Sequence, residues 1–311
     1  MGVEMPPFLC HYRIMQNKHL EHPEDTILNG DLSVLDWFTA DSTISVKMDG
    51  APAIVWGTNP ANGKFFVGTK SVFNKVKIKI NHSHEEIDAN HQGKVADILH
   101  ACFDNLPRTK SVIQGDFIGF GGSDTYCPNT ITYKFPEVIS QKIIVTPHTI
   151  YGSGNDLRNV SAAPLSSKLI STQNCLFVQP EASLNPFRED LEDVCKFAKQ
   201  MSTLCEFVSD RKASQIKKEI NACIKEQKVV DENEIAEKCD CDKNLIRLWK
   251  LVKSIKDDLF LFIHEDDEIE CYLWDVPSFH EGYVISNKYG TLKVVDREVF
   301  SHANFTMQKA W

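Results

Sequence analysis

The chain has 311 residues, of which 42% are hydrophobic and 25% are charged, with 15 glycines and 13 prolines. This composition is typical of a folded globular protein and excludes collagen-like, low-complexity and disordered classes. The net charge of -9 argues against attraction of the whole surface to phosphate backbones or anionic lipid. Any contact with nucleic acid therefore requires a local basic groove.

Neither a membrane segment nor a secretion signal is predicted. The most apolar run, residues 259–263, is much shorter than a bilayer span and has acidic flanks. Residues 1–7 lack the basic and apolar regions of a signal peptide. We therefore expect no membrane partner and a cytoplasmic protein, in the host cytoplasm if it is viral. The ten cysteines are expected to be reduced core thiols rather than a disulfide framework or a zinc site.

The first half of the chain is predicted to be mainly strands. Apolar or alternating runs bounded by turn residues cover residues 43–47, 53–57, 64–68, 111–119 and 141–146. One helix interrupts them, because apolar residues recur at helical spacing over 95–103. These strands are expected to form an antiparallel meander.

The second half begins with a helical segment. Residues 187–263 are rich in charge, poor in glycine and proline, and apolar at helical spacing. Strand patterns then return over residues 270–274, 281–286 and 291–295. A sheet that resumes after helices is typical of an α+β fold with an inserted subdomain. We predict one domain formed by residues 1–186 and 264–311, with a helical insertion at 187–263.

Lys47 is the most informative residue of the sequence. It ends an apolar strand and enters a turn that contains Asp49 and Gly50. A lysine held on a rigid strand can be desolvated, which lowers its pKa and makes it a nucleophile. The same short pattern also fits a surface lysine before an ordinary Asp-Gly turn, so the rest of the chain has to decide.

Four further segments resemble, in order, the motifs of the covalent nucleotidyltransferases, which include ATP-dependent DNA ligases, RNA ligases and mRNA capping enzymes. The pattern around Lys47 resembles the first motif of that superfamily. The others are Gly68–Ser71 with Lys70, Gln114–Gly119 with Asp116, Glu281–Val284, and Thr291–Asp296 with Lys293. The resemblance covers residues 43–296 and implies an antiparallel-sheet, ATP-grasp-like ligase catalytic domain.

The resemblance also implies roles for individual residues. Lys47 would attack the α-phosphorus of ATP to form a lysyl-AMP intermediate, and Lys293 would clamp the phosphate. Asp116 and Glu281 would hold Mg²⁺, and Asp116 is alternatively a ligand of the ribose hydroxyls. The implied nucleotide-binding residues are Lys47, Asp49, Gly50, Lys70, Asp116, Tyr133, His148, Glu281 and Lys293.

Two features of the implied site depend on less specific signals. Tyr133, Phe135 and His148 are candidates for stacking on adenine, and each also fits an ordinary structural position. Residues 75–80 alternate lysine with aliphatic residues, so a strand here would present a row of lysines to a polynucleotide. The same row also fits an edge strand protected against aggregation.

Three departures from the superfamily pattern bear on function. Val295 occupies the position of the second lysine of the last motif, so the clamp would need Lys288 or Arg297 to complete it. Ser45 stands where an acid is common, which leaves the preference for adenine over guanine open. The residues after Asp296 are too few for a C-terminal OB-fold domain, so none is expected and the chain is more like minimal RNA ligases.

The predicted function is ATP-dependent joining of polynucleotides that carry 5′-phosphate and 3′-hydroxyl ends, with RNA favoured. The alternatives are a DNA nick-sealing ligase, a protein AMP-transferase, and a catalytically degenerate nucleotide-binding or phage structural protein. Residues 19–25, 47–57 and 128–130 also resemble a group of uncharacterised ligase-like proteins of large tailed phages.

Overall fold

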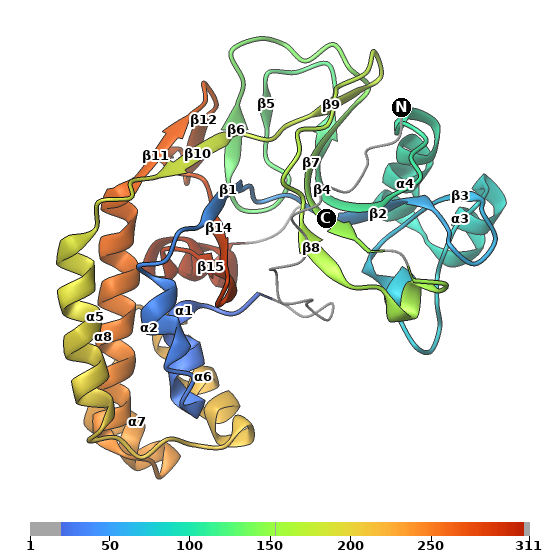
Figure 1. Cartoon of the computed structure of the whole chain (residues 1–311). Helices are drawn as coiled ribbons and strands as arrows, with labels where there is room; N and C mark the ends of the chain where they lie inside the picture. Colours follow the sequence, from blue (N-terminus) through green and yellow to red (C-terminus); the bar gives the residue numbers. More distant parts are fainter. Residues whose placement is uncertain (1–19, 153, 308–311) are drawn as a thin grey trace.

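The computed structural model describes residues 20–152 and 154–307. The predictions made for residues 1–7, Cys10 and His19 lie outside these ranges. The described chain is a mixture of helices and mostly antiparallel sheets, as the α+β prediction requires. Two sheets form its centre, and Figure 1 shows helices α5 and α8 beside one of them and α3 and α4 beside the other.

The larger sheet, sheet A, has six strands. Its strand order is β3-β2-β4-β7-β8, and β9 pairs with β7 in parallel. The bounds are Ala53–Thr58 (β2), Phe65–Gly68 (β3), Val112–Phe120 (β4), Ile143–Tyr151 (β7), Ala162–Pro164 (β8) and Cys175–Phe177 (β9). Helices α3 (His84–Asn90) and α4 (Gly93–Asn105) accompany this sheet, and apolar residues of α4 pack on its buried face.

The second sheet, sheet B, joins two ends of the sequence. Strand β1 (Thr43–Lys47) pairs with β14 (Gly282–Asn287), which pairs with β15 (Gly290–Val294). Two small sheets complete the strands. One has the order β13-β12-β6-β5, with bounds Val276–Ser278, Glu270–Leu273, Thr132–Lys134 and Thr125–Tyr126; the other pairs β10 (Glu181–Leu184) with β11 (Ile263–Asp266).

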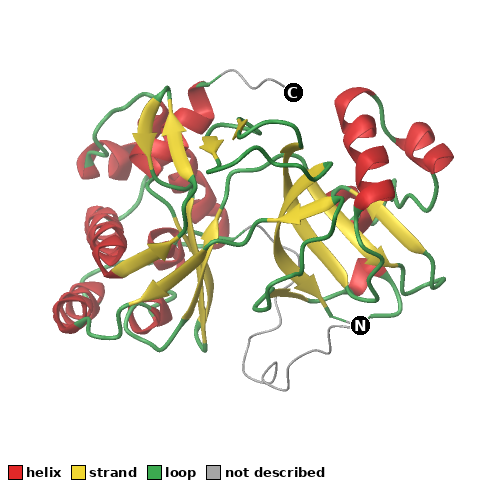
Figure 2. Ribbon diagram, turned by 90° about the horizontal axis from the view of Figure 1, so that it is seen from above, coloured by secondary structure: helices red, strands yellow, loops and turns green. Residues whose placement is uncertain are grey.

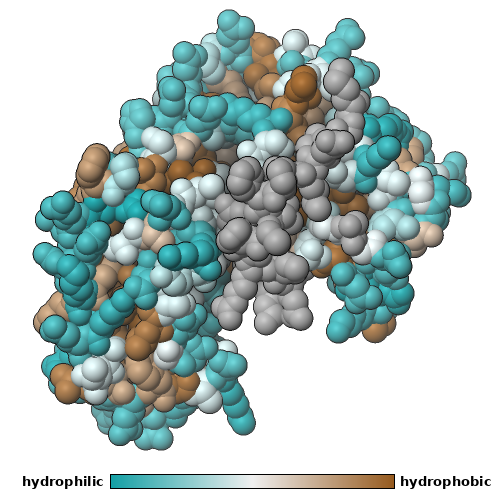
Figure 3. Space-filling model, in the orientation of Figure 1, coloured by the Kyte–Doolittle hydropathy of each residue, from teal (hydrophilic) through white to brown (hydrophobic). Residues whose placement is uncertain are grey.

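Four helices occupy the segment for which the sequence predicts helices. They are α5 (Glu189–Ser202), α6 (Asp210–Lys225), α7 (Glu232–Cys239) and α8 (Lys243–Leu259). Ser209, Asp231 and Asp242 cap the last three through side-chain oxygens that accept backbone N–H groups. Hydrophilic side chains cover much of the outer face of α5 and α8 (Figure 3), while their apolar faces are buried.

These helices share a hydrophobic core with sheet B. One cluster of buried residues includes Trp249 of α8, Leu191 of α5 and Ile285 of β14. The 3-10 turn Ile27–Asn29, which follows the short helix α1 (Pro23–Thr26), and helix α2 (Ser33–Trp37) contribute to the same cluster. Helix α9 (His302–Thr306) is the last helix of the described residues. The limits 187 and 263 therefore mark a change of secondary structure rather than a division of the core. Figure 2 shows the two sheet-and-helix halves from above.

The strand predicted at residues 75–80 is wrong. This segment has no strand, Val76 is 78% exposed, and Lys77 has a positive φ of 56°. Alternation of side chains alone does not make a strand, because the backbone also needs a neighbouring strand to pair with. Next to this segment, among the described residues, Asn81 forms an isolated bridge with Val67. The nine described cysteines are free, and no helix of the described residues is long and apolar enough to cross a membrane.

Candidate functional site

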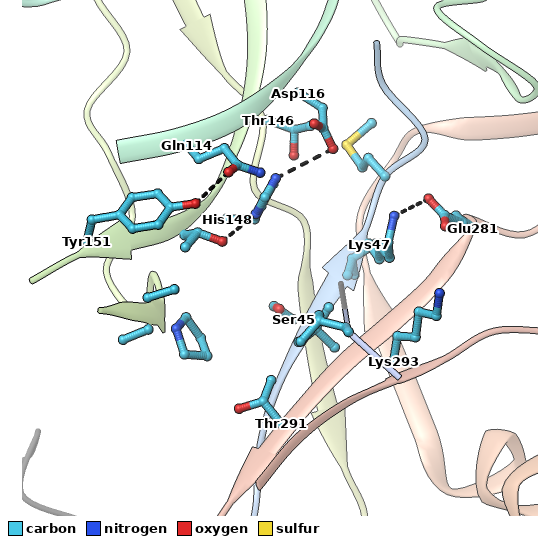
Figure 4. A pocket seen from close by; sticks show the side chains of 18 of the residues that line it. Ser45, Lys47, Gln114, Asp116, Thr146, His148, Tyr151, Glu281, Thr291 and Lys293 are labelled. Carbon is cyan, nitrogen blue, oxygen red and sulfur yellow. Dashed lines mark hydrogen bonds and ion pairs between the residues drawn. The ribbon is translucent and has the colours of Figure 1, made fainter. Parts of the chain in front are cut away.

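A cavity of about 320 Å³ lies between the two sheets. Strands β1, β14 and β15 supply one wall, and strands β4, β7 and β8 supply the facing wall (Figure 4). Six of the residues for which the sequence predicts a role line it together: Lys47, Lys70, Asp116, His148, Glu281 and Lys293.

The alternation of sheet B explains how its wall is built. Ser45 lies opposite Val284, and Val284 lies opposite Lys293, so these side chains share one face of the sheet. The other face carries apolar residues such as Val46 and Ile285, which belong to the core shared with the helices. Polar residues two apart therefore point into the cavity, while their neighbours anchor the strands.

Lys47 is the last residue of β1, and its amine forms an ion pair and hydrogen bond with Glu281. Gly282 follows Glu281 with a φ of +148°, and a Cβ there would lie 2.2 Å from the carbonyl oxygen of Val294. Only glycine fits that approach. The Glu-Gly pair thus brings the carboxylate to the end of β1, beside the lysine.

The electrostatics of this pair keep the lysine protonated. Burial by itself lowers the pKa of Lys47, but the attraction of Glu281 and Asp116 outweighs it and raises the pKa. Burial raises the pKa of Glu281, against the opposing effect of Lys47. Lys47 therefore has to lose a proton before it can act as a nucleophile, and Glu281 is in position to accept it.

Two further lysines line the same cavity. Burial, together with the positive charge of Lys47, lowers the pKa of Lys293. The Lys293 amine has no hydrogen bond or ion pair with any described residue, so it is available to an anion. Lys70 begins a 3-10 turn after β3 that is capped by the side chain of Thr69. The cavity thus holds two lysines besides Lys47.

The facing wall comes from β4 and β7. Gln114 and Asp116 are two residues apart on β4 and therefore share a face, and Asp116 lies opposite Thr146 in the register. The His148 Nε2 atom is 3.5 Å from Asp116 Oδ2, and its Nδ1 is 2.7 Å from Thr149 Oγ1. His148 lowers the pKa of Asp116 and so outweighs the opposite effect of burial, with help from Lys47.

Asp49 and Gly50 support the site from behind rather than lining the cavity. The Asp49 carboxylate accepts hydrogen bonds from the Asn129 side chain at 2.6 Å and from the Thr130 and Ile131 backbone N–H groups at 2.6 and 3.1 Å. A Cβ on Gly50 would lie 2.7 Å from the Asp116 Cβ. These two residues therefore fix the turn after Lys47 and let β4 approach it.

The predicted stacking role of Tyr133 is wrong. Its side chain is fully buried, and its hydroxyl accepts a hydrogen bond of 2.5 Å from the Asp49 N–H. Phe135 is also buried and does not line the cavity. Among the three stacking candidates, His148 alone lines it.

The predicted completion of the phosphate clamp by Lys288 or Arg297 is also wrong. Arg297 is 2% exposed and pairs with Glu24 and Asp25. Lys288 is exposed at the turn between β14 and β15, where it lies over the ring of Tyr289. Neither lines the cavity, whereas Lys70 does.

The sequence reasoning assigned no role to several residues that line the cavity. They are Gln114, Thr146, Thr149, Tyr151 and Thr291, and the Tyr151 hydroxyl donates to Gln114 Oε1 at 2.6 Å. Side chains two residues apart on a strand point to the same face, and this pattern could have indicated some of these residues. Gln114 stands two residues before Asp116, and Thr146 two before His148.

The donor set fits an ion of the magnesium type. Asp116 and Glu281 present carboxylate oxygens to one cavity, and Mg²⁺ prefers a few carboxylates together with phosphate oxygens and water. Each carboxylate has a basic side chain beside it, His148 and Lys47 respectively. An incoming phosphate and its metal would therefore rearrange these pairs.

The chain belongs to DUF6267, a family of unknown function, whose model matches residues 17–240 and 187–309. No curated protein and no solved structure matches the chain.

Proposed function

We propose that this protein is an ATP-dependent polynucleotide ligase that acts through a lysyl-AMP intermediate on Lys47. One observation carries the proposal. Lys47, Lys70, Asp116, Glu281 and Lys293 come from segments spread over most of the chain and line a single cavity. These are the residues singled out by the resemblance to covalent nucleotidyltransferases, whose fold we propose for the catalytic core.

The first step joins AMP to the protein. Glu281 accepts a proton from the Lys47 amine, whose nitrogen then attacks the α-phosphorus of ATP. A nitrogen–phosphorus bond forms as the bond to pyrophosphate breaks, pyrophosphate leaves with its electron pair, and the nitrogen releases its second proton to solvent. In the second step a 5′-phosphate oxygen attacks the same phosphorus, the nitrogen–phosphorus bond breaks, and Lys47 leaves as an amine that takes a proton back. A 3′-hydroxyl finally gives up its proton and attacks the 5′-phosphorus, so that the strand is closed and AMP leaves.

The lysines that line the cavity, and a bound Mg²⁺, would neutralise negative charge during these steps. Phosphoryl transfer depends on positioning and on neutralising charge at the phosphate oxygens. Lys293 supplies that charge from the wall of sheet B, and Lys70, in the turn after β3, lines the same cavity. Asp116 and Glu281 would hold Mg²⁺, which neutralises phosphate charge when bound.

RNA is the proposed acceptor. The acceptor is tested separately from the first step. The adenylylated protein is offered single-stranded RNA with a 5′-phosphate, nicked DNA, and a protein substrate. Transfer to nicked DNA alone would identify the nick-sealing alternative, and transfer to protein would identify an AMP-transferase.

The adduct assay tests the proposal directly. The protein is incubated with Mg²⁺ and each of the four nucleoside triphosphates labelled at the α-phosphate, and the label on the chain is measured. We expect labelling by ATP, its loss in Lys47→Ala, and its retention in Lys64→Ala, a matched change of an exposed lysine outside the cavity. Undiminished labelling of Lys47→Ala would refute the proposal.

One observation favours a second candidate, a nucleotide-binding protein without turnover. Val295 is 2% exposed at the position where the superfamily has its second lysine, so this segment contributes one lysine, Lys293, to the cavity. This candidate predicts that ATP binds, as measured by calorimetry, but that no nucleotide labels the chain. Binding together with labelling excludes it.

A further inference from the structure

A second cluster of polar side chains lies outside the nucleotide cavity. Glu265 of β11, Asp267 just after it, and His280 just before β14 bring their donor atoms within 4.8 Å of one another. They line a hollow of their own, which strands β12 and β13 also border. None of the three residues lines the nucleotide cavity. The proposed ligase chemistry therefore leaves this cluster unexplained.

Hydrogen bonds around His280 fix which ring nitrogen faces the carboxylates. The Cys271 thiol donates to the carbonyl of Ile269 at 3.9 Å, and its sulfur lies 3.5 Å from His280 Nδ1. The sulfur is thus free to accept the Nδ1 proton. His280 Nε2 then lies 3.0 Å from Asp267 Oδ2, and in the metal-free protein it holds the proton of this contact, which a bound metal ion would displace.

The cluster has an excess of negative charge. The His280 side chain is 2% exposed and that of Asp267 is 11% exposed. The Oε1 atom of Glu265 is buried and has no hydrogen-bond partner among the described residues. Within the same residues, no lysine or arginine pairs with either carboxylate, and His280 is the sole partner of Asp267 in an ion pair. A buried carboxylate oxygen without a donor is costly unless a cation compensates it.

We propose that Glu265, Asp267 and His280 bind one divalent transition-metal ion of the zinc type. One imidazole nitrogen with two carboxylates is a donor set that Zn²⁺ accepts in four-coordinate sites, with water in the fourth position. Mg²⁺ and Ca²⁺ prefer oxygen donors alone and fit this set less well. The contact between Nδ1 and Cys271 supplies the outer-shell partner that metal-binding histidines usually have.

The position of the site gives the ion a structural role. His280 directly precedes Glu281, the partner of Lys47, and its ring stacks on Tyr133 with centroids 5.7 Å apart. The Tyr133 hydroxyl in turn accepts the Asp49 N–H. An ion bound here would fix the start of β14 against the β11–β12 connection. The proposal does not depend on the ligase function, because its test measures metal binding.

The test uses the full chain, freed of metal by chelator and dialysis, and titrates it with ZnCl₂ in calorimetry and in competition with a chromogenic chelator. We expect one site per chain, and Asp267→Asn, Glu265→Gln and His280→Gln each to weaken it by at least about tenfold. Glu268→Gln changes an exposed acid of the same connection and should bind like the wild type. Circular dichroism shows which variants are folded.

Three outcomes would overturn the proposal. The first is that the wild type binds no more Zn²⁺ than the folded variants do. Any Zn²⁺ bound by the exposed Cys127 thiol is the same in the wild type and the variants, so it does not affect this comparison. The second is tighter binding of Mg²⁺ than of Zn²⁺. The third is a near-ultraviolet thiolate-to-metal band in the Co²⁺-loaded protein that disappears in Cys271→Ser. Such a band would show that the Cys271 thiolate is itself a metal ligand. A Co²⁺ spectrum without that band supports the donor set.

Discussion

The two walls of the cavity that Lys47 lines are supported in different ways. Behind sheet A, helix α4 buries Ile98, Leu99 and Cys102 in a cluster that also contains Trp56 and Phe177. The rings of Trp56 and Phe177 stack with their centroids 6.0 Å apart. This wall therefore rests on apolar packing.

Behind sheet B, the support includes buried charge. Arg297 lies 2.9 Å from Asp25 and 3.2 Å from Glu24, and Lys256 lies 3.6 Å from Glu24. Lys256 also donates to the carbonyl of Val295 at 2.9 Å, at the end of β15. The cluster connects α1, α8 and the segment after β15, next to the strand that carries Lys293.

The comparison shows that the buried charges behind sheet B affect the charge of a residue that lines the cavity. The apolar packing behind sheet A has no such effect. The positive charge of Arg297 is among the causes that lower the pKa of Lys293, and Asp25 acts in the opposite direction. Changes behind sheet B are therefore expected to alter both stability and the cavity. Changes behind sheet A should act through packing alone.

The largest effect is expected from Arg297→Leu. Removing the guanidinium leaves Glu24 and Asp25 buried with fewer partners, which costs about 3–5 kcal/mol of unfolding free energy in comparable cases. Chemical denaturation measures the change. The matched control is Arg158→Leu, which breaks an exposed pair with Asp156 and should leave the unfolding free energy nearly unchanged. Equal effects of the two variants would contradict the contrast between the walls.

A somewhat smaller effect is expected from Leu99→Ala behind sheet A. Leu99 is fully buried, so its truncation removes apolar contacts and leaves a cavity, at a cost of about 3 kcal/mol. Leu204→Ala, at a position that is 71% exposed, should change stability by less than about 0.5 kcal/mol. Because the described residues behind this wall form no buried charge cluster, the pH dependence of stability should be the same in Leu99→Ala and the wild type. A change in that dependence would argue against purely apolar support.

Trp249→Phe is expected to have the next effect in size, behind sheet B. The Trp249 Nε1 donates to Asp25 Oδ1 at 3.0 Å, and phenylalanine keeps much of the ring but not the donor. Loss of a hydrogen bond to a charged group costs about 2 kcal/mol. Combined with Arg297→Leu in a double-mutant cycle, the two changes should be non-additive because they share Asp25. Additivity would mean that the cluster does not act as a unit.

Much of the fold could be predicted from local patterns. The strands at β1, β2, β4, β14 and β15 and the helices of residues 187–263 follow hydrophobic periodicity, which depends on neighbours in the sequence. The short strands β5, β8 and β13 and helix α3 have too few residues for a pattern to stand out. The shared core of sheet B and the helices depends on contacts between distant segments, which no local pattern reports.

The site was predictable to the same extent and for the same reason. Lys47, Lys293 and Asp116 were predicted as site residues because they stand in motifs that occur in the expected order. The alternation of side chains along a strand would also have predicted that Gln114 faces the cavity. The burial of Tyr133 could not be inferred, because it goes with a hydrogen bond to Asp49, in the turn after β1. His280 was missed as well, since the β12–β13 hairpin separates it in sequence from its carboxylate partners.

The last prediction concerns pH and the carboxylate at the end of sheet B. Adduct formation needs the neutral Lys47 amine, and the raised pKa of Lys47 means that its rate should climb as pH rises from about 6 to about 10. Glu281 is the foremost group that raises this pKa, so in Glu281→Gln burial should lower it and move the midpoint of the rate profile to lower pH. The maximal rate should fall at the same time, because the proton acceptor is lost.

Single-turnover labelling at saturating ATP measures both quantities. Glu270→Gln provides the control, since Glu270 lies on β12 and pairs with the exposed Lys134 outside the cavity; its midpoint should match the wild type. A midpoint in Glu281→Gln that stays in place or moves to higher pH would show that another group holds the Lys47 proton. Asp116, on the facing wall, would then be the group to change, because its charge also raises the pKa of Lys47. That result would place control of the nucleophile on sheet A rather than on sheet B.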